Sequence, residues 1–325
     1  MLKNKTHMKN IVTIGGGSGQ FVLLSGLRDV KNINIKAVVS MVDSGGSTGR
    51  LRDELGVLPP GDVLKCVLAL SPDREYARKI LQKRFKSDNR LSGHNAGNML
   101  LSILSQYAGS FPYGIRALGE VLDIKGEVLP VTTDKATLVA ELTDGNRLYG
   151  EAAIDIPRGN QREKIKKTYL VPHHSNCIKV YPPVLKAIKQ AKYIIVGPGD
   201  LFTSIIPNFL ISEVKEEIKK TKAKIIYVVN VMTKFGETDN FKGEDFVYDL
   251  EKAMGRKVDY VIFNSEILEK KILQQYKKQK AEPVKMHREK KWNGRTVIKE
   301  DIVSTQGGVV RHDEEKLAAI IEKII

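Results

Sequence analysis

The sequence predicts an α/β protein with a Rossmann-like, doubly wound and mainly parallel sheet, forming a single domain over residues 9–325. Short apolar runs rich in β-branched residues, typical of buried parallel strands, alternate along the chain with helical patterns. Several of these runs lead directly into glycine-rich polar loops, and open α/β sheets bind ligands at that edge. With 325 residues, 42% of them hydrophobic, the chain is long enough to bury one large core.

The first strand is predicted at residues 11–14 and is followed by a glycine loop and a helix whose apolar positions run to Leu27. Glycines let the backbone approach a ligand, and a helix start offers unpaired N–H groups and a positive dipole end. The pattern favours a phosphate site, with a structural turn as the alternative. Gln20 replaces the last glycine of the G-x-G-x-x-G dinucleotide motif, and no Walker lysine-serine pair is present. The candidate binding residues are Gly15, Gly16, Gly17, Ser18 and Gly19.

A second strand is predicted at residues 33–41, and it also leads into a polar glycine loop. Asp43 suits a ribose hydroxyl or a hydrated cation, with a turn or cap role as the alternative. Arg50 suits a phosphate, unless it pairs with a neighbouring acid. Asp62 is either the N-cap of the next helix or a ligand contact. The candidate residues of this stretch are Asp43, Ser44, Gly45, Gly46, Arg50 and Asp62.

Polar residues gather again before a strongly apolar helix that begins near Met99, after a helical stretch at residues 74–85. His94, Asn95 and Asn98 either bind a sugar or phosphate or cap that helix.

The sequence pattern changes after this helix. Apolar and polar residues alternate on both sides of a turn at residues 143–146, which predicts a β-hairpin within an antiparallel insertion at about residues 121–156. Residues 157–168 form a basic stretch that either closes over an anionic ligand or is a solvated linker.

The parallel pattern then returns. Buried strands are predicted at residues 193–196, 225–231 and 260–264, and the last helix at residues 314–325. A third glycine loop follows the first of these strands and enters a helix. Its candidate residues are Gly197, Pro198, Gly199, Asp200, Thr203 and Ser204.

Composition narrows the functional classes. The net charge of +15 comes largely from lysines that alternate with apolar residues, as on solvated helix faces, and with 6% aromatic residues a specific nucleic-acid site is not expected. Cys66 and Cys177 are isolated, which disfavours disulfides and a cysteine-rich metal site. The start of the sequence has no apolar signal core, and no run approaches the roughly 18–20 apolar residues of a membrane span. We therefore expect a cytoplasmic protein.

The motifs taken together resemble the YvcK-type gluconeogenesis-factor family, which is similar to the CofD-like 2-phospholactate transferases. The resemblance covers about residues 9–323 and is carried by IGGGSGQFVLLSGL, VDSGGSTGRLRDELGVLPPGD, LSGHNAGNMLL, VGPGDLFTSIIPN and VVNVMTKFGETDNF. It implies a Rossmann-like fold and a cytoplasmic binder of a uridine-diphosphate sugar such as UDP-N-acetylglucosamine. It also implies a role in bacterial morphogenesis and carbon metabolism, a homodimer, and protein partners in cell-wall synthesis.

The resemblance also assigns residues. It places the diphosphate on residues 15–19 and the nucleotide or sugar at residues 43–46, and it sets Asn95 and Asn98 in a G-H-x-x-G-N motif. Residues 197–204, with Asn230 and Thr233 from residues 230–233, would complete the cleft. Ser44 departs from the family, which commonly has an aspartate there.

Two functions follow from these observations. The first is a regulatory nucleotide-sugar binder with no required cofactor, since no Ser-His-Asp, Cys-His or HExxH constellation is present and no catalytic or metal-binding residue is assigned. The second is a transferase in which Asp43 holds Mg²⁺ against a diphosphate. Because Ser44 leaves Asp43 without an adjacent carboxylate, we expect binding to depend little on Mg²⁺. An NAD-binding or nucleic-acid-binding protein is a third, weaker alternative.

Overall fold

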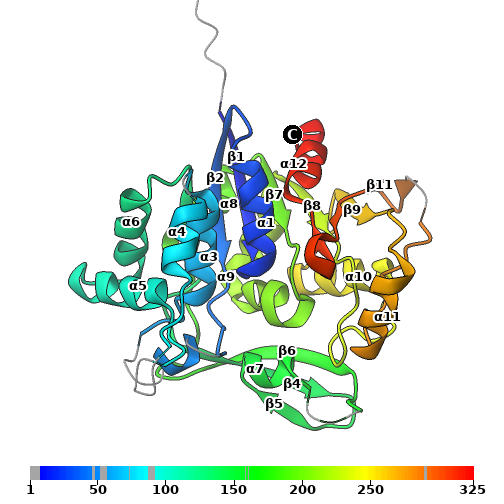
Figure 1. Ribbon diagram of the computed structural model, residues 1–325, viewed down its shortest axis with the longest axis horizontal. Coiled ribbons are helices and arrows are strands. Elements are labelled where there is room, and N and C mark those ends of the chain that lie inside the picture. The colour runs from blue at the N-terminus through cyan, green and yellow to red at the C-terminus, as the bar shows by residue number, and fades with distance from the viewer. Residues whose placement is uncertain are drawn as a thin grey trace, which may run out of the picture.

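The computed structural model describes residues 8–325, apart from residues 46–47, 52–56, 73, 87–91, 158, 160 and 289–290. It contains an eight-stranded sheet with the strand order β10-β11-β9-β8-β7-β1-β2-β3 (Figure 1). Every neighbouring pair in this sheet is parallel except β10 with β11, which confirms the predicted α/β class. The strands are β1 (Lys9–Gly15), β2 (Ile33–Val39), β3 (Glu127–Pro130), β7 (Tyr193–Val196), β8 (Lys224–Val228), β9 (Tyr260–Asn264), β10 (Lys291–Trp292) and β11 (Arg295–Glu300).

The order of the strands reverses between β1 and β7. From β1 the chain runs outward through β2 to β3, and it then crosses to β7 and continues in the opposite direction through β8 and β9. Ile14 of β1 is in register with Val196 of β7, so these two strands end side by side. The loops that follow them lead away to opposite sides, which leaves a crevice at the carboxyl edge of the sheet.

Helices cover both faces of the sheet (Figure 1). On one face α1 packs against α3 and α12, and on the other α9 packs against α8 and α10. None of the helices in the described ranges is long and apolar enough to cross a membrane. The helices are α1 (Ser18–Leu27), α3 (Gly61–Leu70), α4 (Arg74–Leu81), α5 (Ala96–Tyr107), α6 (Phe111–Val121), α8 (Pro182–Gln190), α9 (Ser212–Lys220), α10 (Gly243–Met254), α11 (Lys270–Lys278) and α12 (Glu314–Ile324).

Shorter elements complete the chain. The third glycine loop is predicted to enter a regular helix. In the structure it leads instead into a π-helical turn and then a 3₁₀ turn. The predicted strands at residues 33–41 and 225–231 end earlier, at Val39 and Val228, because their last residues belong to the loops beyond the sheet. The shorter elements are η1 (Leu201–Ile205), η2 (Ile206–Leu210), η3 (Gln306–Gly308), β12 (Val303–Ser304) and β13 (Arg311–His312).

An antiparallel insertion lies below the carboxyl edge of the main sheet (Figure 1). The hairpin expected at residues 143–146 is present, since β4 (Ala136–Leu142) pairs with β5 (Arg147–Tyr149). The expected bounds of 121–156 are wrong, because β3 belongs to the main sheet and a third strand, β6 (Ile165–Pro172), pairs with β4. Residues 157–168 are therefore not one loop. The insertion also contains the short helix α7 (Glu151–Asp155).

The insertion has a small hydrophobic core of its own. Leu138 and Ala140 of β4 pack with Ile154 of α7 and with Val42, which follows β2. This cluster is separate from the large core of the main sheet. The insertion is joined to the rest of the molecule by Val42, by Ile165 and Leu170 of β6, which also pack against the large core, and by polar contacts.

Gln20 explains why the glycine motif is incomplete. Its side chain is fully buried and bridges two strands: Thr13 Oγ1 donates to its Oε1 at 2.5 Å, and its Nε2 donates to the Val38 carbonyl at 2.9 Å. In the dinucleotide motif a glycine at this position brings helix and strand close together. Here an amide fills the space and fixes α1 to β1 and β2.

We predict that Gln20→Leu destabilises the fold by about 1–3 kcal/mol, because it leaves the buried Thr13 hydroxyl and the Val38 carbonyl without these partners. Urea unfolding measures the change. The matched control is Gln274→Leu, at an exposed position of α11, which should change stability by no more than about 0.5 kcal/mol. Equal effects of the two substitutions would contradict this role.

Candidate functional site

A cleft of 480 Å³ lies at the crevice between β1 and β7. Residues from the loops after β1, β2, β7 and β8 line it, and α7 and β13 add further walls. The structure thus brings the three predicted glycine loops together. The predicted residues that line the cleft are Gly16, Gly17, Ser18, Gly19, Asp43, Asp62, Pro198, Gly199, Asp200, Thr203, Ser204 and Asn230.

The glycines of the first loop allow other parts of the protein to come close. A Cβ atom on Gly19 would lie 1.9 Å from the Pro198 carbonyl oxygen, and one on Gly17 would lie 2.7 Å from the Cα of Asp62. The glycines are therefore required by packing between loops, whatever space they leave for a ligand. No side chain caps the start of α1 at Gly17, so the first N–H groups of this helix remain available at the cleft.

Asp62 does not cap α3, contrary to one of its two predicted roles. The N-cap is Pro60, and Asp62 lies inside the first turn. Lys65 Nζ donates to Asp62 Oδ1 at 3.1 Å and to the Ser18 hydroxyl at 3.0 Å. Burial opposes the positive charge of Lys65, but the carboxylates of Asp62 and Asp43 outweigh it and raise the Lys65 pKa. Asp62 and Lys65 thus join α3 to the start of α1.

Asp43 is not a solitary carboxylate. Burial, and then the neighbouring charge of Asp62, raise the Asp43 pKa, while the Gly45 N–H donates to Asp43 Oδ1 at 3.0 Å and opposes that shift. Glu151 of α7 also lines the cleft. The premise that Ser44 leaves Asp43 alone is therefore wrong, because the fold supplies carboxylates from distant parts of the chain.

Glu151 lies where the insertion contacts the cleft. Burial, followed by the charges of Asp43 and Asp155, raises the Glu151 pKa to about 7. The Ser44 N–H donates to Glu151 Oε2 at 3.4 Å, and the Ser44 hydroxyl accepts from the Ala152 N–H at 3.0 Å. Ser44 does not line the cleft; it holds the start of α7.

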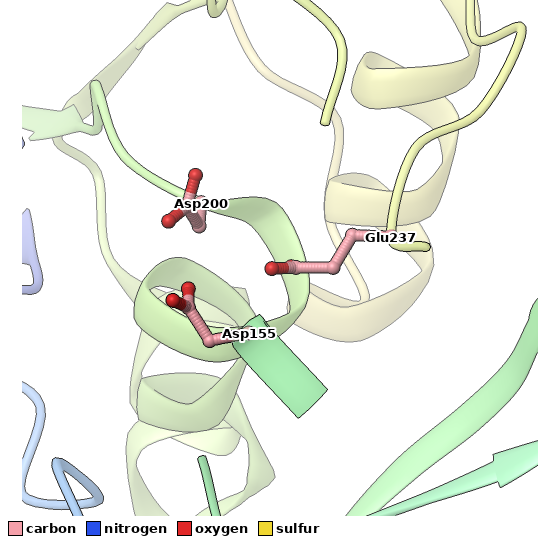
Figure 2. A group of neighbouring side chains, drawn as sticks. All are labelled: Asp155, Asp200 and Glu237. Carbon is pink, nitrogen blue, oxygen red and sulfur yellow. The ribbon is translucent and has the colours of Figure 1, made fainter. Parts of the chain in front are cut away.

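Lys234 lies beside three carboxylates at the edge of the cleft. Asp155, Asp200 and Glu237 point toward one another (Figure 2), with one oxygen of each within 4.8 Å of the others. Lys234 Nζ forms ion pairs with all three. Glu237, with 1% of its side chain exposed, is the most deeply buried of them.

The remaining wall comes from residues in the C-terminal part of the chain that no sequence motif indicated. His312 Nε2 lies 3.1 Å from the Val229 carbonyl, and burial lowers the His312 pKa to about 4. The Tyr276 hydroxyl accepts from the Val310 N–H at 2.9 Å. Arg311 is exposed and forms no ion pair with any residue that the structure describes, so its charge remains available at the cleft.

Other predicted residues have structural contacts away from the cleft lining. Asn95 caps α5 by accepting from the Asn98 N–H at 2.8 Å. Arg50 Nη2 donates to the Ser92 carbonyl at 2.7 Å instead of facing a phosphate site, and the Thr233 hydroxyl accepts from the Glu282 N–H at 2.9 Å. Gly15, Gly45, His94, Asn98 and Gly197 also lie outside the lining, and Gly46 lies outside the described residues.

Some cleft residues were missed because their signal is weak. Glu151 and Asp155 are spaced four residues apart and so share one helix face, a pattern that could have been found within the insertion. Arg311 and His312 follow a Gly-Gly pair and precede the last helix. Lys65 lies one turn after Asp62, a common ion-pair spacing.

These features define a Rossmann-like α/β protein with a polar cleft at the topological switch point of its sheet. The sequence pattern of the family described as "2-phospho-L-lactate transferase CofD" matches residues 11–303. The chain belongs to this family.

Curated relatives and a solved structure agree with this assignment. A protein of Thermotoga maritima is 41% identical over 320 residues, which cover 97% of this chain and 98% of the relative. The Bacillus subtilis protein named "Gluconeogenesis factor" is 38% identical, with 97% and 98% covered. The crystal structure of a UPF0052 family member from Bacillus halodurans matches with a TM-score of 0.89 at 37% identity, covering 96% of this chain and 99% of that chain. The resemblance expected from the motifs is thus confirmed.

The raised pKa of Glu151 gives a pH prediction. Below about pH 4.5 Glu151 is protonated in both the folded and the unfolded protein. Between about pH 4.5 and pH 7 the Glu151 carboxyl ionises readily only in the unfolded protein. Glu151 therefore lowers stability as the pH rises through this window. Glu151→Gln, which mimics the protonated form, should stabilise the protein by roughly 1–2 kcal/mol near pH 8, a value reduced for partial solvent screening, and have little effect near pH 4.

Thermal unfolding at the two pH values measures this difference. Glu322→Gln, at an exposed position of α12, is the matched control, and its effect on the unfolding temperature should be the same at the two pH values. A Glu151→Gln effect that does not change with pH would contradict the interpretation.

Proposed function

We propose that the protein is a cytoplasmic binder of a nucleoside-diphosphate sugar, of the UDP-N-acetylglucosamine class, and that it regulates carbon metabolism and cell shape. The observation that carries the proposal is the distribution of charge around the cleft. The start of α1 and Arg311, which has no ion pair among the described residues, suit phosphate, and the acidic side chains suit hydroxyl groups.

This distribution favours a nucleotide sugar over a simple anion. A phosphate alone would be repelled by Asp43, which lines the same cleft; Asp62 and Asp200 line it too, but they pair with Lys65 and Lys234. Ribose and sugar hydroxyls, by contrast, donate hydrogen bonds to carboxylates. The Asn230 amide adds a further polar group: its Oδ1 accepts from the Gly199 N–H at 3.2 Å, and its NH₂ group could donate to a ligand.

A transferase is the second candidate, and the carboxylates favour it. Asp43 and Asp62 are oxygen ligands of the kind that Mg²⁺ prefers, and their mutual repulsion would be relieved by a cation. The two would hold Mg²⁺, which would offset negative charge on a diphosphate. The family name supports a group transfer of this kind.

Titration calorimetry separates the two candidates. The ligands are UDP-N-acetylglucosamine, UDP-glucose, UDP and NAD, each with Mg²⁺ and with EDTA, followed by chromatography of the nucleotides after long incubation. A regulator binds the UDP-sugar and returns it intact. Release of a nucleotide that strictly requires Mg²⁺ would assign the transferase instead.

The resemblance also suggests a homodimer and partners in cell-wall synthesis, and both belong to this proposal. Light scattering after size-exclusion chromatography measures the first. Capture on the protein with and without bound UDP-sugar, using cell-wall enzymes as prey, measures the second.

We predict that Arg311→Gln weakens UDP-sugar binding by about 10–100-fold, because a hydrogen bond to a charged group contributes roughly 1.5–3 kcal/mol. Arg116→Gln is the matched control, since Arg116 is exposed on α6 and pairs with Glu120. Equal affinity of the Arg311 variant and the unsubstituted protein would remove Arg311 from the site.

Asp43→Asn should weaken binding by about 5–100-fold through a lost hydrogen bond to a ligand hydroxyl, worth roughly 1–3 kcal/mol. For the regulator this loss is the same with Mg²⁺ and with EDTA. A loss seen only with Mg²⁺ identifies Asp43 as a metal ligand. Asp123→Asn, at an exposed turn, should bind like the unsubstituted protein.

A further inference from the structure

Lys234 joins three segments that are far apart in the sequence. Its Nζ lies 2.8 Å from Asp200 in the loop after β7 and 3.0 Å from Glu237 in its own loop after β8. It also pairs with Asp155, the last residue of α7 in the insertion. One ammonium group therefore contacts two neighbouring loops on the β7 side of the crevice and the insertion beneath it.

The backbone around Lys234 is held firmly. The Lys234 N–H donates to the Thr238 hydroxyl at 2.9 Å, and the Lys234 carbonyl accepts from the Glu237 and Thr238 N–H groups. The turn is closed further by the Gly236 N–H, which donates to Asp239 at 2.7 Å. The backbone of Lys234 is thus held in place in the loop after β8, and from there its side chain can position the insertion.

The insertion meets this turn directly. A Cβ atom on Gly236, where φ is +81°, would lie 2.3 Å from the ring of Pro157 and 3.0 Å from Arg162. Arg162 Nη1 in turn donates to the Ile154 carbonyl at 2.6 Å. The chain that leaves α7 is therefore packed against the same turn that carries Lys234.

The charges in this cluster require a cation. Three carboxylates, each with one oxygen within 4.8 Å of the others, repel one another; Glu237 is buried, and Asp155 and Asp200 are half-buried. Thr203 gives Glu237 only long contacts of 3.4 Å. Burial opposes the charge on Lys234, yet Glu237 and Asp200 outweigh it and raise the Lys234 pKa, which favours the charged ammonium.

The cluster also reaches the cleft. Asp155 and Asp200 line it, and Glu151 lies one turn before Asp155 on the same helix. A shift of α7 would therefore move Glu151 and Asp155 together, although Lys234 itself does not line the cleft.

We propose that Lys234 is a positioning residue: its ammonium is a tethered cation that occupies the place a divalent metal ion would take among Asp155, Asp200 and Glu237, and it fixes the insertion against the sheet. The consequence for ligand affinity rests on the function proposed above. The consequence for the insertion itself does not.

The test is to remove the tethered cation and supply a free one. Lys234→Ala leaves three carboxylates of suitable spacing around an empty volume. The variant should bind one Mn²⁺ per chain more than the unsubstituted protein, measured by electron paramagnetic resonance of free Mn²⁺. Adding Asp155→Asn to the variant should abolish this extra ion. Lys224→Ala is the matched control, because Lys224 pairs with Asp259 at the other end of β8, and it should gain none.

Hydrogen exchange reports on the insertion without any nucleotide. In Lys234→Ala the amides of β4, α7 and β6 should exchange at least about tenfold faster, equivalent to roughly 1.4 kcal/mol of local opening, and Mn²⁺ should restore their protection. UDP-sugar affinity should fall and recover in parallel. If the exchange and Mn²⁺ results appear but the unsubstituted protein binds no nucleotide sugar, the proposed function fails and the role of Lys234 stands.

Absence of both the extra Mn²⁺ and the faster exchange would overturn the proposal. If Lys234→Ala does not fold, Asp155→Asn alone removes the insertion's side of the contact at a half-buried residue. It should loosen the same amides, and unchanged exchange in that variant would equally overturn the proposal.

Discussion

The start of α1 lies directly against the carbonyl of Pro198, and the geometry of the cleft depends on that close approach. Gly19 permits it, because any Cβ atom there would overlap the carbonyl oxygen. The contact fixes the first helix to the loop that leaves β7 on the opposite side of the strand reversal. Gln20, the next residue, then anchors the same helix to β1 and β2 through its buried amide. The crevice between the two halves of the sheet is therefore held open by rigid elements.

The charged groups divide this crevice into regions of different electrostatic potential. Carboxylates from the loop after β2, from α3 and from α7 meet on one side, where burial makes Asp43 and Glu151 harder to ionise. The helix start and Arg311 offer positive potential on another. Lys234 forms ion pairs with a third group of acids, next to the cleft. A polar molecule with one anionic part and several hydroxyl groups matches such a surface better than a uniformly charged one.

The parts of the site that could be predicted from the sequence are those in which strand and loop are adjacent along the chain. Residues 15–19 and 197–204 follow buried strands, and parallel strands bring such loops to one edge. Lys65 and Arg311 could not be placed in this way, since their positions depend on how helices and a C-terminal strand pack. Asp62 shows the same limit: the sequence allowed a capping role, but the N-cap is Pro60, two residues earlier, and the Asp62 carboxylate pairs with Lys65 instead.

The packing of α12 on α1 has a consequence for biosynthesis. Gly26 lets the two helices touch, because a Cβ atom there would lie 2.1 Å from the Glu314 carbonyl oxygen, and Arg311 and His312 immediately precede α12. The first of the described helices is thus covered by the last of them. At a synthesis rate of about 5–20 residues per second, the apolar face of α1 stays uncovered for on the order of tens of seconds until α12 is made. A nascent chain during that interval has an incomplete cleft and an uncovered surface on which chaperones can act.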